Sequence, residues 1–235
     1  MKQGFVKVAS ATPRIRVADP VYNAQVICEQ AKEAAEHGAK IVVFPELCIT
    51  GYTCNDLFLQ ELLLEKAKEA LLTIAEETGQ LETLFLVGLP VDKDGRLYNV
   101  AAVLYRGRIL GMIPKKNIPM YAEFYEGRHF TPGEETVTEY RLGKQVIPFG
   151  SNLLFRCEEL PELILGCELC EDLWVAEPPS TSHALMGATV IANLSASNET
   201  VSKDDYRTLL IKASSARLLC GYIYTLSLIH ISEPT

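Results

Sequence analysis

The most informative segment of this 235-residue chain is LILGCELCEDLW, residues 163–174. Its first part is an almost continuous apolar run, which predicts a strand that is buried on both faces. The run ends at Cys170, and the acidic residues Glu171 and Asp172 begin a turn or a helix. A thiol at the tip of a buried strand, just before a sharp turn, is typical of a nucleophile elbow.

The rest of the chain alternates buried strands with amphipathic helices. Short apolar runs predict strands at 5–10, 41–44, 83–89, 152–156, 162–168, 189–194 and 222–224, and a hairpin-like pair at 99–105 and 108–113. Apolar residues at helical spacing predict helices at 21–37, 56–78 and 202–220. A polar stretch with proline and glycine, 120–150, separates two groups of strands. This order indicates an α/β fold whose sheets are covered by helices.

The composition argues against several classes of function. Apolar residues make up 48% and charged residues 22% of the chain, as in an ordinary soluble domain. The net charge of −8 argues against nucleic acid and anionic membranes as partners. No apolar run approaches the roughly 18 residues of a membrane span, and no signal-peptide core is present, so we expect a cytoplasmic protein. The seven cysteines are expected to be free thiols.

Two further segments place a reactive side chain directly after a buried strand. In VVFPELCITGY, residues 42–52, Glu46 follows apolar residues, and partial desolvation raises the pKa of such a carboxyl, which suits a general base. In GMIPKKNIPMYAEFYEGRHF, residues 111–130, Lys115 follows a strand and a proline. Taken alone, each would be a solvated surface residue, so the argument depends on the three segments together.

Cys167 and Cys170 also form a C-x-x-C pair, which raises the alternatives of a zinc site or a redox pair. A zinc site needs about four ligands, and the sequence has no second pair with such spacing. On a strand, two residues an odd number of positions apart point to opposite faces. Neither alternative is favoured, and we expect no metal in this domain.

Together the three segments resemble the nitrilase superfamily, whose triad is glutamate, lysine and cysteine in that chain order. Within it, the motifs PELCITGY, YAEFYE, CEDLW and NLSASNE resemble those of the glutaminase domains of bacterial glutamine-dependent NAD synthetases. The resemblance runs from the N-terminus to about residue 224. It implies a four-layer α-β-β-α sandwich.

The resemblance also implies a role for each site residue. Glu46 would take the proton of the Cys170 thiol, and the thiolate would attack the side-chain amide of glutamine. Lys115 and the backbone N–H of Glu171 would hold the oxyanion. The residues implied to bind substrate are Tyr121, Ser197 and Lys203, which would grip the α-amino and α-carboxylate groups, Tyr52 and Phe124 as pocket wall, and Glu123 as a second carboxylate near Lys115. Relatives often have arginine at the position of Lys203.

The implied reaction gives glutamate and ammonia through a Cys170 thioester, which water hydrolyses with Glu46 as base. In the family, the ammonia feeds the conversion of deamido-NAD to NAD in a following synthetase domain that uses ATP and Mg. This chain carries no glycine-serine loop for ATP, so glutamine is the expected ligand and no cofactor is expected here. Family members usually associate, and a homo-oligomer is therefore expected.

Residues 1–225 are expected to form a glutaminase domain that is incomplete at its C-terminal end. The last residues, 226–235, fit no expected element, and we expect a non-native tail there. A site without its supporting elements is expected to be poorly active, and a catalytically dead fragment stays an alternative. A further alternative is a stand-alone nitrilase-type amidase or carbamoylase that acts on another small amide.

Overall fold

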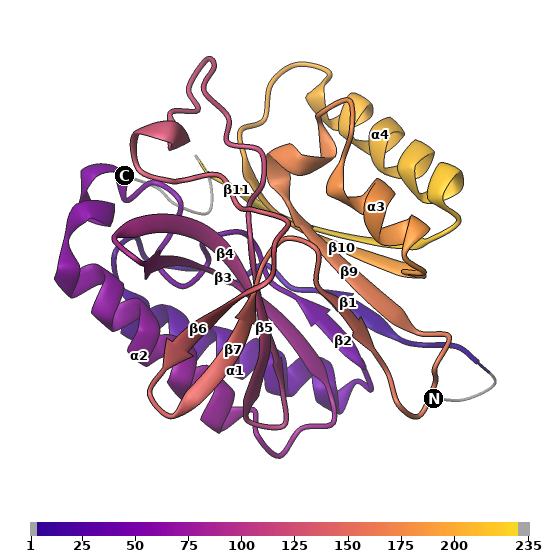
Figure 1. Cartoon of the computed structure of the whole chain (residues 1–235), viewed down its shortest axis with the longest axis horizontal. Coiled ribbons are helices and arrows are strands. Elements are labelled where there is room, and N and C mark those ends of the chain that lie inside the picture. The colour runs from indigo at the N-terminus through magenta and orange to yellow at the C-terminus, as the bar shows by residue number, and fades with distance from the viewer. Residues whose placement is uncertain (1–3, 230–235) are drawn as a thin grey trace.

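Two β-sheets lie face to face, and helices cover the outer face of each, in the computed structural model, which describes residues 4–229. Figure 1 shows α1 (Pro20–Glu36) and α2 (Glu61–Glu77) on one side, and α3 (Pro179–Leu185) and α4 (Lys203–Leu218) on the other. The larger sheet has the order β1-β2-β3-β4-β5-β7-β6, and the smaller sheet has the order β11-β10-β9-β8. The predicted α-β-β-α sandwich is confirmed.

The parallel strands of both sheets set the position of the site. The larger sheet consists of β1 (Val8–Ser10), β2 (Ile41–Val43), β3 (Leu84–Lys93), β4 (Arg96–Tyr105), β5 (Arg108–Pro114), β6 (Thr138–Leu142) and β7 (Gln145–Phe149). The smaller sheet consists of β8 (Leu154–Arg156), β9 (Ile164–Leu169), β10 (Val190–Ser197) and β11 (Gly221–Leu228). Short 3-10 helices are η1 (Asn55–Leu59), η2 (Glu126–Arg128) and η3 (Cys170–Leu173). Strands β1, β2 and β3 are parallel, as are β9, β10 and β11, so the carboxyl ends of each set meet at one end of its sheet.

Helix boundaries follow from capping residues. Asp19 caps α1 by accepting a backbone N–H of the first turn, and Pro20 fills a position where no N–H donor is needed. Gly38, with a φ of +83°, follows the end of the helix in the left-handed conformation that glycine adopts most easily. The helix predicted at 56–78 is instead η1 followed by α2, because Gln60 between them is extended, with a ψ of 119°.

Some elements differ from the sequence-based expectation. Residues 138–149, inside the stretch read as irregular, form the hairpin β6–β7 at the edge of the larger sheet. Charged residues and a proline on the exposed face of this hairpin weaken the alternation of apolar and polar residues that predicts a strand. The helix α3 was not predicted either, because it is too short to show a long run of apolar residues at helical spacing. Strand β11 pairs with β10 through Leu228, so the expectation that nothing after 225 fits an element is wrong for 226–228. Residues 230–235 of the expected tail lie outside the described residues.

The hydrophobic core forms two layers. Because neighbouring residues of a strand point to opposite faces, Phe85 packs under the helices α1 and α2, while Leu86 packs between the two sheets. Cys167 and Leu194 of the smaller sheet complete the layer between the sheets, and both are fully buried. Across residues 4–229, no helix combines the length and the apolar character that crossing a membrane requires.

Candidate active site

Three strands bring the predicted catalytic side chains together, because each strand leads directly into one of them. Strand β2 leads into Glu46, β5 into Lys115 and β9 into Cys170. The first two strands belong to the larger sheet and the third to the smaller one, so the site lies between the sheets at their carboxyl ends. The exposed fractions of the three residues are 0%, 0% and 6%.

Lys115 lies between two buried carboxylates. Its Nζ donates to Oε1 of Glu46 and to Oε1 of Glu126, each at 2.7 Å. Burial lowers the pKa of a lysine, but the charges of Glu126 and Glu46 outweigh this effect, and the pKa of Lys115 is raised well above its usual value. The lysine is therefore a cation that is held in place and buried from solvent.

Three N–H donors hold the Glu46 carboxylate. Oε1 accepts from Lys115 Nζ and from Asn99 Nδ2, each at 2.7 Å, and Oε2 accepts from the backbone N–H of Ala196 at 2.9 Å. Burial raises the pKa of Glu46 to about 7, against the opposing effect of Lys115. A carboxyl that titrates near neutrality can take up and return a proton, as a general base must.

The second carboxylate beside Lys115 is Glu126, and the prediction of Glu123 for this place is wrong. Glu123 is exposed, whereas Glu126 is buried at the start of η2. Tyr52, predicted as pocket wall, donates its hydroxyl to Glu126 Oε1 at 2.9 Å. Both glutamates lie in the motif YAEFYE, and spacing alone does not tell which one faces the lysine. The local turn of η2 decides it.

Cys170 occupies a sharp turn at the end of β9. Its φ of 42° lies in the left-handed region, which is uncommon for a residue other than glycine and often marks a functional site. The thiol donates to the carbonyl oxygen of Ala196 at 3.4 Å. Burial, followed by the negative charge of Glu46, raises the pKa of Cys170. The sulfur therefore rests as a thiol and needs a base to become a nucleophile.

The two cysteines of the C-x-x-C pair lie in different environments. Cys167 packs in the core between the sheets, while Cys170 follows the end of the strand. Neither Cys167 nor Cys170 takes part in a disulfide within the described residues. Within the part of the chain that the structure describes, no group of three or more His, Cys, Asp or Glu side chains is placed to hold a metal ion.

Asp172 ties the cysteine turn to the lysine turn. Its carboxylate accepts the backbone N–H of Leu169 at 3.0 Å, and both the backbone N–H and the side-chain amide of Asn117 at 2.8 Å each. Asn117 lies two residues after Lys115. The buried carboxylate of Asp172 therefore holds the turn at Cys170 against the turn that carries Lys115. Burial raises the pKa of Asp172 to about 6.

Lys203 is held at the start of α4, where β10 has just ended. Its Nζ donates to Ser197 Oγ at 2.9 Å, and it lies 5.2 Å and 5.7 Å from the ring centroids of Phe124 and Trp174. Burial lowers the pKa of Lys203, and Cys170 is near enough to act in the opposite sense. The sequence analysis predicts no role for Trp174. Its place in the motif CEDLW is the signal that could have indicated one.

Glu171 contributes a side chain to the site in addition to its predicted backbone N–H. Its half-buried carboxylate accepts a hydrogen bond of 2.8 Å from the hydroxyl of Tyr121, and burial raises the pKa of Glu171. Tyr121 also packs edge-on against Phe124, with ring centroids 5.7 Å apart. Phe124 in turn contacts Lys203. The predicted residues Tyr121, Phe124, Ser197 and Lys203 thus form one connected group beside the nucleophile.

Gly88 lets strand β3 approach the turn that carries Glu46. A Cβ placed on Gly88 would lie 2.3 Å from the backbone N of Leu47 and 2.7 Å from the carbonyl oxygen of Pro45. Both are backbone atoms, so neither can move without shifting Glu46. Glu46 can therefore occupy its position only because residue 88 has no side chain.

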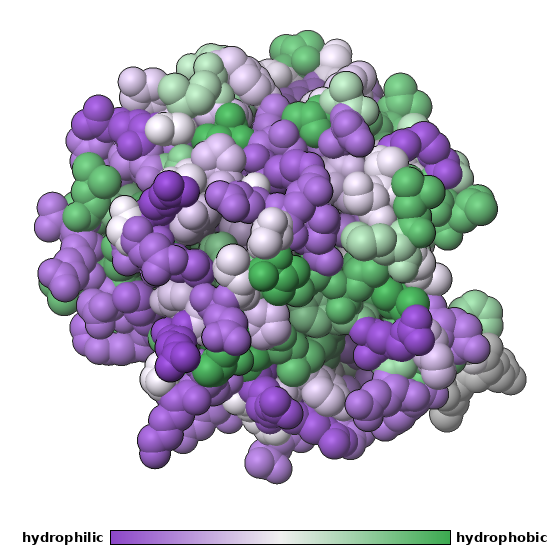
Figure 2. All heavy atoms as spheres, viewed as in Figure 1, coloured by the Kyte–Doolittle hydropathy of each residue, from purple (hydrophilic) through white to green (hydrophobic). Residues whose placement is uncertain are grey.

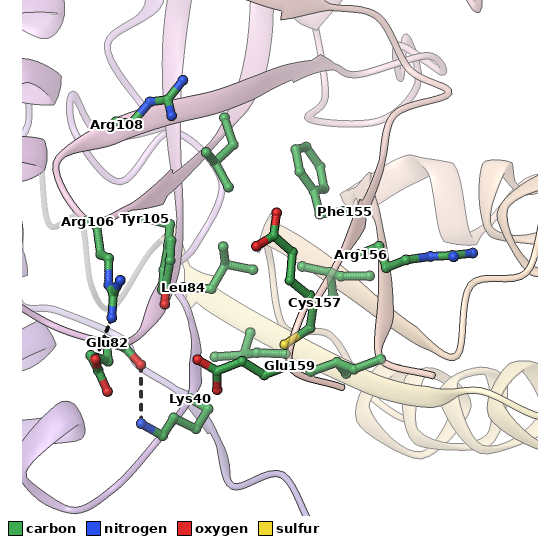
Figure 3. A pocket seen from close by; sticks show the side chains of 15 residues that line it. Lys40, Glu82, Leu84, Tyr105, Arg106, Arg108, Phe155, Arg156, Cys157 and Glu159 are labelled. Atoms are coloured by element: carbon green, nitrogen blue, oxygen red, sulfur yellow. Dashed lines mark hydrogen bonds and ion pairs between the residues drawn. The ribbon is translucent and has the colours of Figure 1, made fainter. Parts of the chain in front are cut away.

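A cavity of 580 Å³ lies at the opposite end of the sandwich, where β2, β3 and β9 begin. Figure 3 shows its lining, which includes the apolar side chains of Leu84 and Phe155 and an ion pair of Arg106 and Glu82. In Figure 2, hydrophobic side chains gather below the centre of the view, between the two sheets. None of the three predicted catalytic residues lines this cavity.

Comparison with protein sequences gives one consistent family. The model of the family described as carbon-nitrogen hydrolase matches residues 7–226. The glutamine-dependent NAD(+) synthetases of Mycobacterium tuberculosis (strain H37Rv) and Thermotoga maritima are 41% identical over 223 residues and 34% identical over 225 residues. These alignments cover 95% and 94% of this chain but 33% and 35% of the relatives, so the chain spans about a third of their length.

Solved structures agree. A glutamine-dependent NAD(+) synthetase from Cytophaga hutchinsonii has a TM-score of 0.83 and 29% identity, over 94% of this chain and 36% of that chain. An amidase from Nesterenkonia sp. has a TM-score of 0.72 and 19% identity, over 96% of this chain and 77% of that chain, which shows a shared fold. The family match extends over almost the whole chain and agrees with the triad assembled at the strand ends. The chain belongs to the carbon-nitrogen hydrolase family.

Proposed function

We propose that this chain is the glutaminase domain of a glutamine-dependent NAD synthetase and hydrolyses the side-chain amide of glutamine through a thioester on Cys170. The observation that carries the proposal is the buried Lys115, held between two carboxylates beside a protonated thiol. The identity of 41% to a synthetase that is named for its dependence on glutamine supports glutamine as the substrate.

The first half of the reaction forms the thioester. Glu46 takes the proton as the S–H bond of Cys170 breaks, and the sulfur electron pair attacks the amide carbon while the carbonyl π pair moves onto oxygen. A lysine ammonium has three N–H donors, of which Glu46 and Glu126 engage two. The third donor of Lys115 stabilises the oxyanion, together with the backbone N–H of Glu171.

The second half releases both products. The C–N bond breaks as Glu46 returns its proton to the leaving nitrogen, and ammonia departs. Water then attacks the thioester with Glu46 as base, the C–S bond breaks, and glutamate leaves while the sulfur regains a proton. One carboxyl serves as base and as acid in turn, which a pKa of about 7 supports.

Charged groups of opposite sign beside Cys170 would select glutamine. Lys203, held by Ser197, suits the α-carboxylate, and the Glu171 carboxylate with the Tyr121 hydroxyl suits the α-ammonium. A pocket that pairs with both groups rejects amides that lack them, because its own polar groups then stay unpaired.

Loss of one of these contacts with glutamine is expected to raise KM more than it lowers kcat. Tyr121→Phe, Ser197→Ala and Lys203→Ala should each raise KM for glutamine by roughly tenfold, with a smaller change in kcat, because the lost contact acts on ground state and transition state alike. Lys203→Arg is the matched control, since it keeps the charge. Steady-state kinetics on glutamine and on propionamide would check this. Propionamide turnover equal to that of glutamine would instead favour a stand-alone amidase.

A side chain at position 88 is expected to misplace the base. Gly88→Ala should lower kcat by on the order of a hundredfold, because a shift of about 1 Å in a catalytic group costs that much. Gly221→Ala is the matched control, since a Cβ there meets nothing nearer than 3.7 Å. Rates and melting temperatures of both variants would be compared. A folded Gly88→Ala protein with normal kcat would contradict the assigned role of this close approach.

The proposal extends to a longer protein of the same kind as the relatives, of which this chain would be the glutaminase domain. Its ammonia would be consumed in a synthetase domain that uses ATP and Mg²⁺ to convert deamido-NAD to NAD. The glutaminase reaction itself would use no cofactor, and the assembled protein would be a homo-oligomer.

The direct test uses the chain with glutamine and with diazo-oxo-norleucine, a glutamine analogue that carries a reactive diazoketone in place of the amide. We expect equal amounts of glutamate and ammonia to be released, and the analogue to label Cys170 once, as located by peptide mass spectrometry. Labelling needs a single attack, so it is measurable even at low turnover. Labelling of another cysteine, or none, in folded protein would overturn the proposal.

A further inference from the structure

Asn99 carries a buried amide that contacts both carboxylates that bind Lys115. It lies on β4 with an exposed fraction of 0%, and its Nδ2 is 2.7 Å from Glu46 Oε1 and 3.4 Å from Glu126 Oε2. Its backbone carbonyl accepts the N–H of Lys115 at 2.8 Å. Its side-chain oxygen is buried and has no hydrogen-bond partner among residues 4–229. The two carboxylates, which need donors, thus set the orientation of the amide.

The two oxygens of Glu46 are not equivalent. Oε1 accepts from both Lys115 Nζ and Asn99 Nδ2, and a carboxylate oxygen has about two lone-pair sites. Oε1 is therefore saturated. From the part of the chain that the structure describes, Oε2 accepts one hydrogen bond, donated by the backbone N–H of Ala196 at 2.9 Å, and it keeps one lone pair for a proton.

Ala196 places this free lone pair beside the thiol. The pairing of β10 with β9 stops at Leu194, while β10 continues to Ser197. The N–H and C=O of one strand residue point to the same side, so both groups of Ala196 face the space beyond the end of β9. The N–H donates to Glu46 Oε2, and the C=O accepts the thiol of Cys170 at 3.4 Å.

We propose that Glu46 Oε2 is the atom that takes the thiol proton, and that Asn99 is the positioning residue that reserves this role by saturating Oε1. The inference rests on the proposed function for its substrate. In the step, the S–H bond of Cys170 breaks, an O–H bond forms at Oε2, and the electron pair stays on sulfur for attack. Asn99 does not touch the reacting atoms and acts through Glu46.

Removing the amide has a directional consequence. The hydrogen bond from Asn99 favours the ionised form of Glu46 and so lowers the pKa of that carboxyl. In Asn99→Leu, which is close in size and excludes water, the pKa rises and a higher pH is needed to ionise the base. In Asn99→Ala, the smaller side chain leaves room for a water donor, so the shift is smaller.

The experiment measures the rate at which iodoacetamide alkylates Cys170 against pH, with the labelled peptide quantified by mass spectrometry. We expect the acid limb of the profile to move upward by roughly one pH unit in Asn99→Leu, and alkylation below the limb to slow by roughly tenfold. Asn99→Ala should move the limb in the same direction by less. Asn23→Leu is the matched control, because Asn23 is equally buried but bonds backbone groups of Arg16 and Ile49. Its limb should stay in place even if its melting temperature falls.

The outcomes separate this inference from the proposed function. If glutamine is hydrolysed but neither Asn99 variant moves the limb, the role of Asn99 is overturned and the glutaminase stands. If the limb moves as expected in protein that releases no ammonia from glutamine, the proton route stands and the proposed substrate is wrong. Should Asn99→Leu fail to fold, an unmoved limb in folded Asn99→Ala alone overturns the inference.

Discussion

Glutamine hydrolysis is expected to fall by on the order of 10⁴-fold or more when Cys170 is replaced by alanine, because the covalent route is then closed. The neighbouring Cys167 is not placed to substitute for it, since it packs in the core between the sheets. Binding should survive, because Tyr121, Ser197 and Lys203 remain. Ammonia release would give the rate, and calorimetry with glutamine would give the affinity.

Cys167→Ala is the matched control for this variant. It makes the same chemical change three residues earlier, on the strand β9 that leads into Cys170, where the side chain is fully buried. It should lower the free energy of unfolding by about 1 kcal/mol through lost packing and leave kcat close to normal. A Cys170→Ala protein that still turned over glutamine, or a Cys167→Ala protein that was folded but inactive, would contradict the assignment of the nucleophile.

The sequence was sufficient to predict that Glu46, Lys115 and Cys170 lie in one site, because the three residues share one local pattern. Glu46, Lys115 and Cys170 each follow a buried strand, and a strand reads directly from a short apolar run. The resemblance to the nitrilase superfamily then implied a role for each residue and predicted the sandwich. The comparisons confirm the family, and the structure places all three residues within one site.

The parts that the sequence missed depend on irregular backbone and on contacts between distant segments. Glu126 was overlooked in favour of Glu123 because a single turn, η2, decides which of the two is buried. Asn99 gave no signal, since a polar residue in an apolar strand has many possible partners until the sheet is assembled. Gly88 likewise matters through backbone atoms that are more than forty positions away in the chain.

Replacing the base should remove one limb of the pH profile. The rate of the unmodified chain should rise as the pH passes through about 7, because only the ionised form of Glu46 accepts the thiol proton. Glu46→Gln keeps the shape but takes up no proton in this range. We expect kcat to fall by on the order of 10³-fold and the acid limb to disappear. A Glu46→Gln profile with the limb unchanged would assign that titration to another group.

Replacing the cation should cost stability as well as rate. Lys115→Met leaves the carboxylates of Glu46 and Glu126 buried without their shared partner, which is expected to lower the free energy of unfolding by about 3–5 kcal/mol. Its kcat should fall about as far as that of Glu46→Gln. Because base and cation act as a unit, the double variant should be little slower than the slower single one. Losses that multiply would place one of the two residues outside the reacting group.

The pH dependence of stability distinguishes a lost ion pair from simple mispacking in Lys115→Met. Lys115 lowers the pKa of Glu46, so its removal raises that pKa further above the unfolded value of about 4.3. The folded chain then binds a proton that the unfolded chain releases, and stability is gained as the pH falls. The melting temperature of Lys115→Met should therefore recover in part between about pH 8 and about pH 5, more than that of Glu46→Gln. If the melting temperature of Lys115→Met lay below that of the unmodified chain by the same amount at both pH values, lost packing and not the lost charge would account for the lower stability.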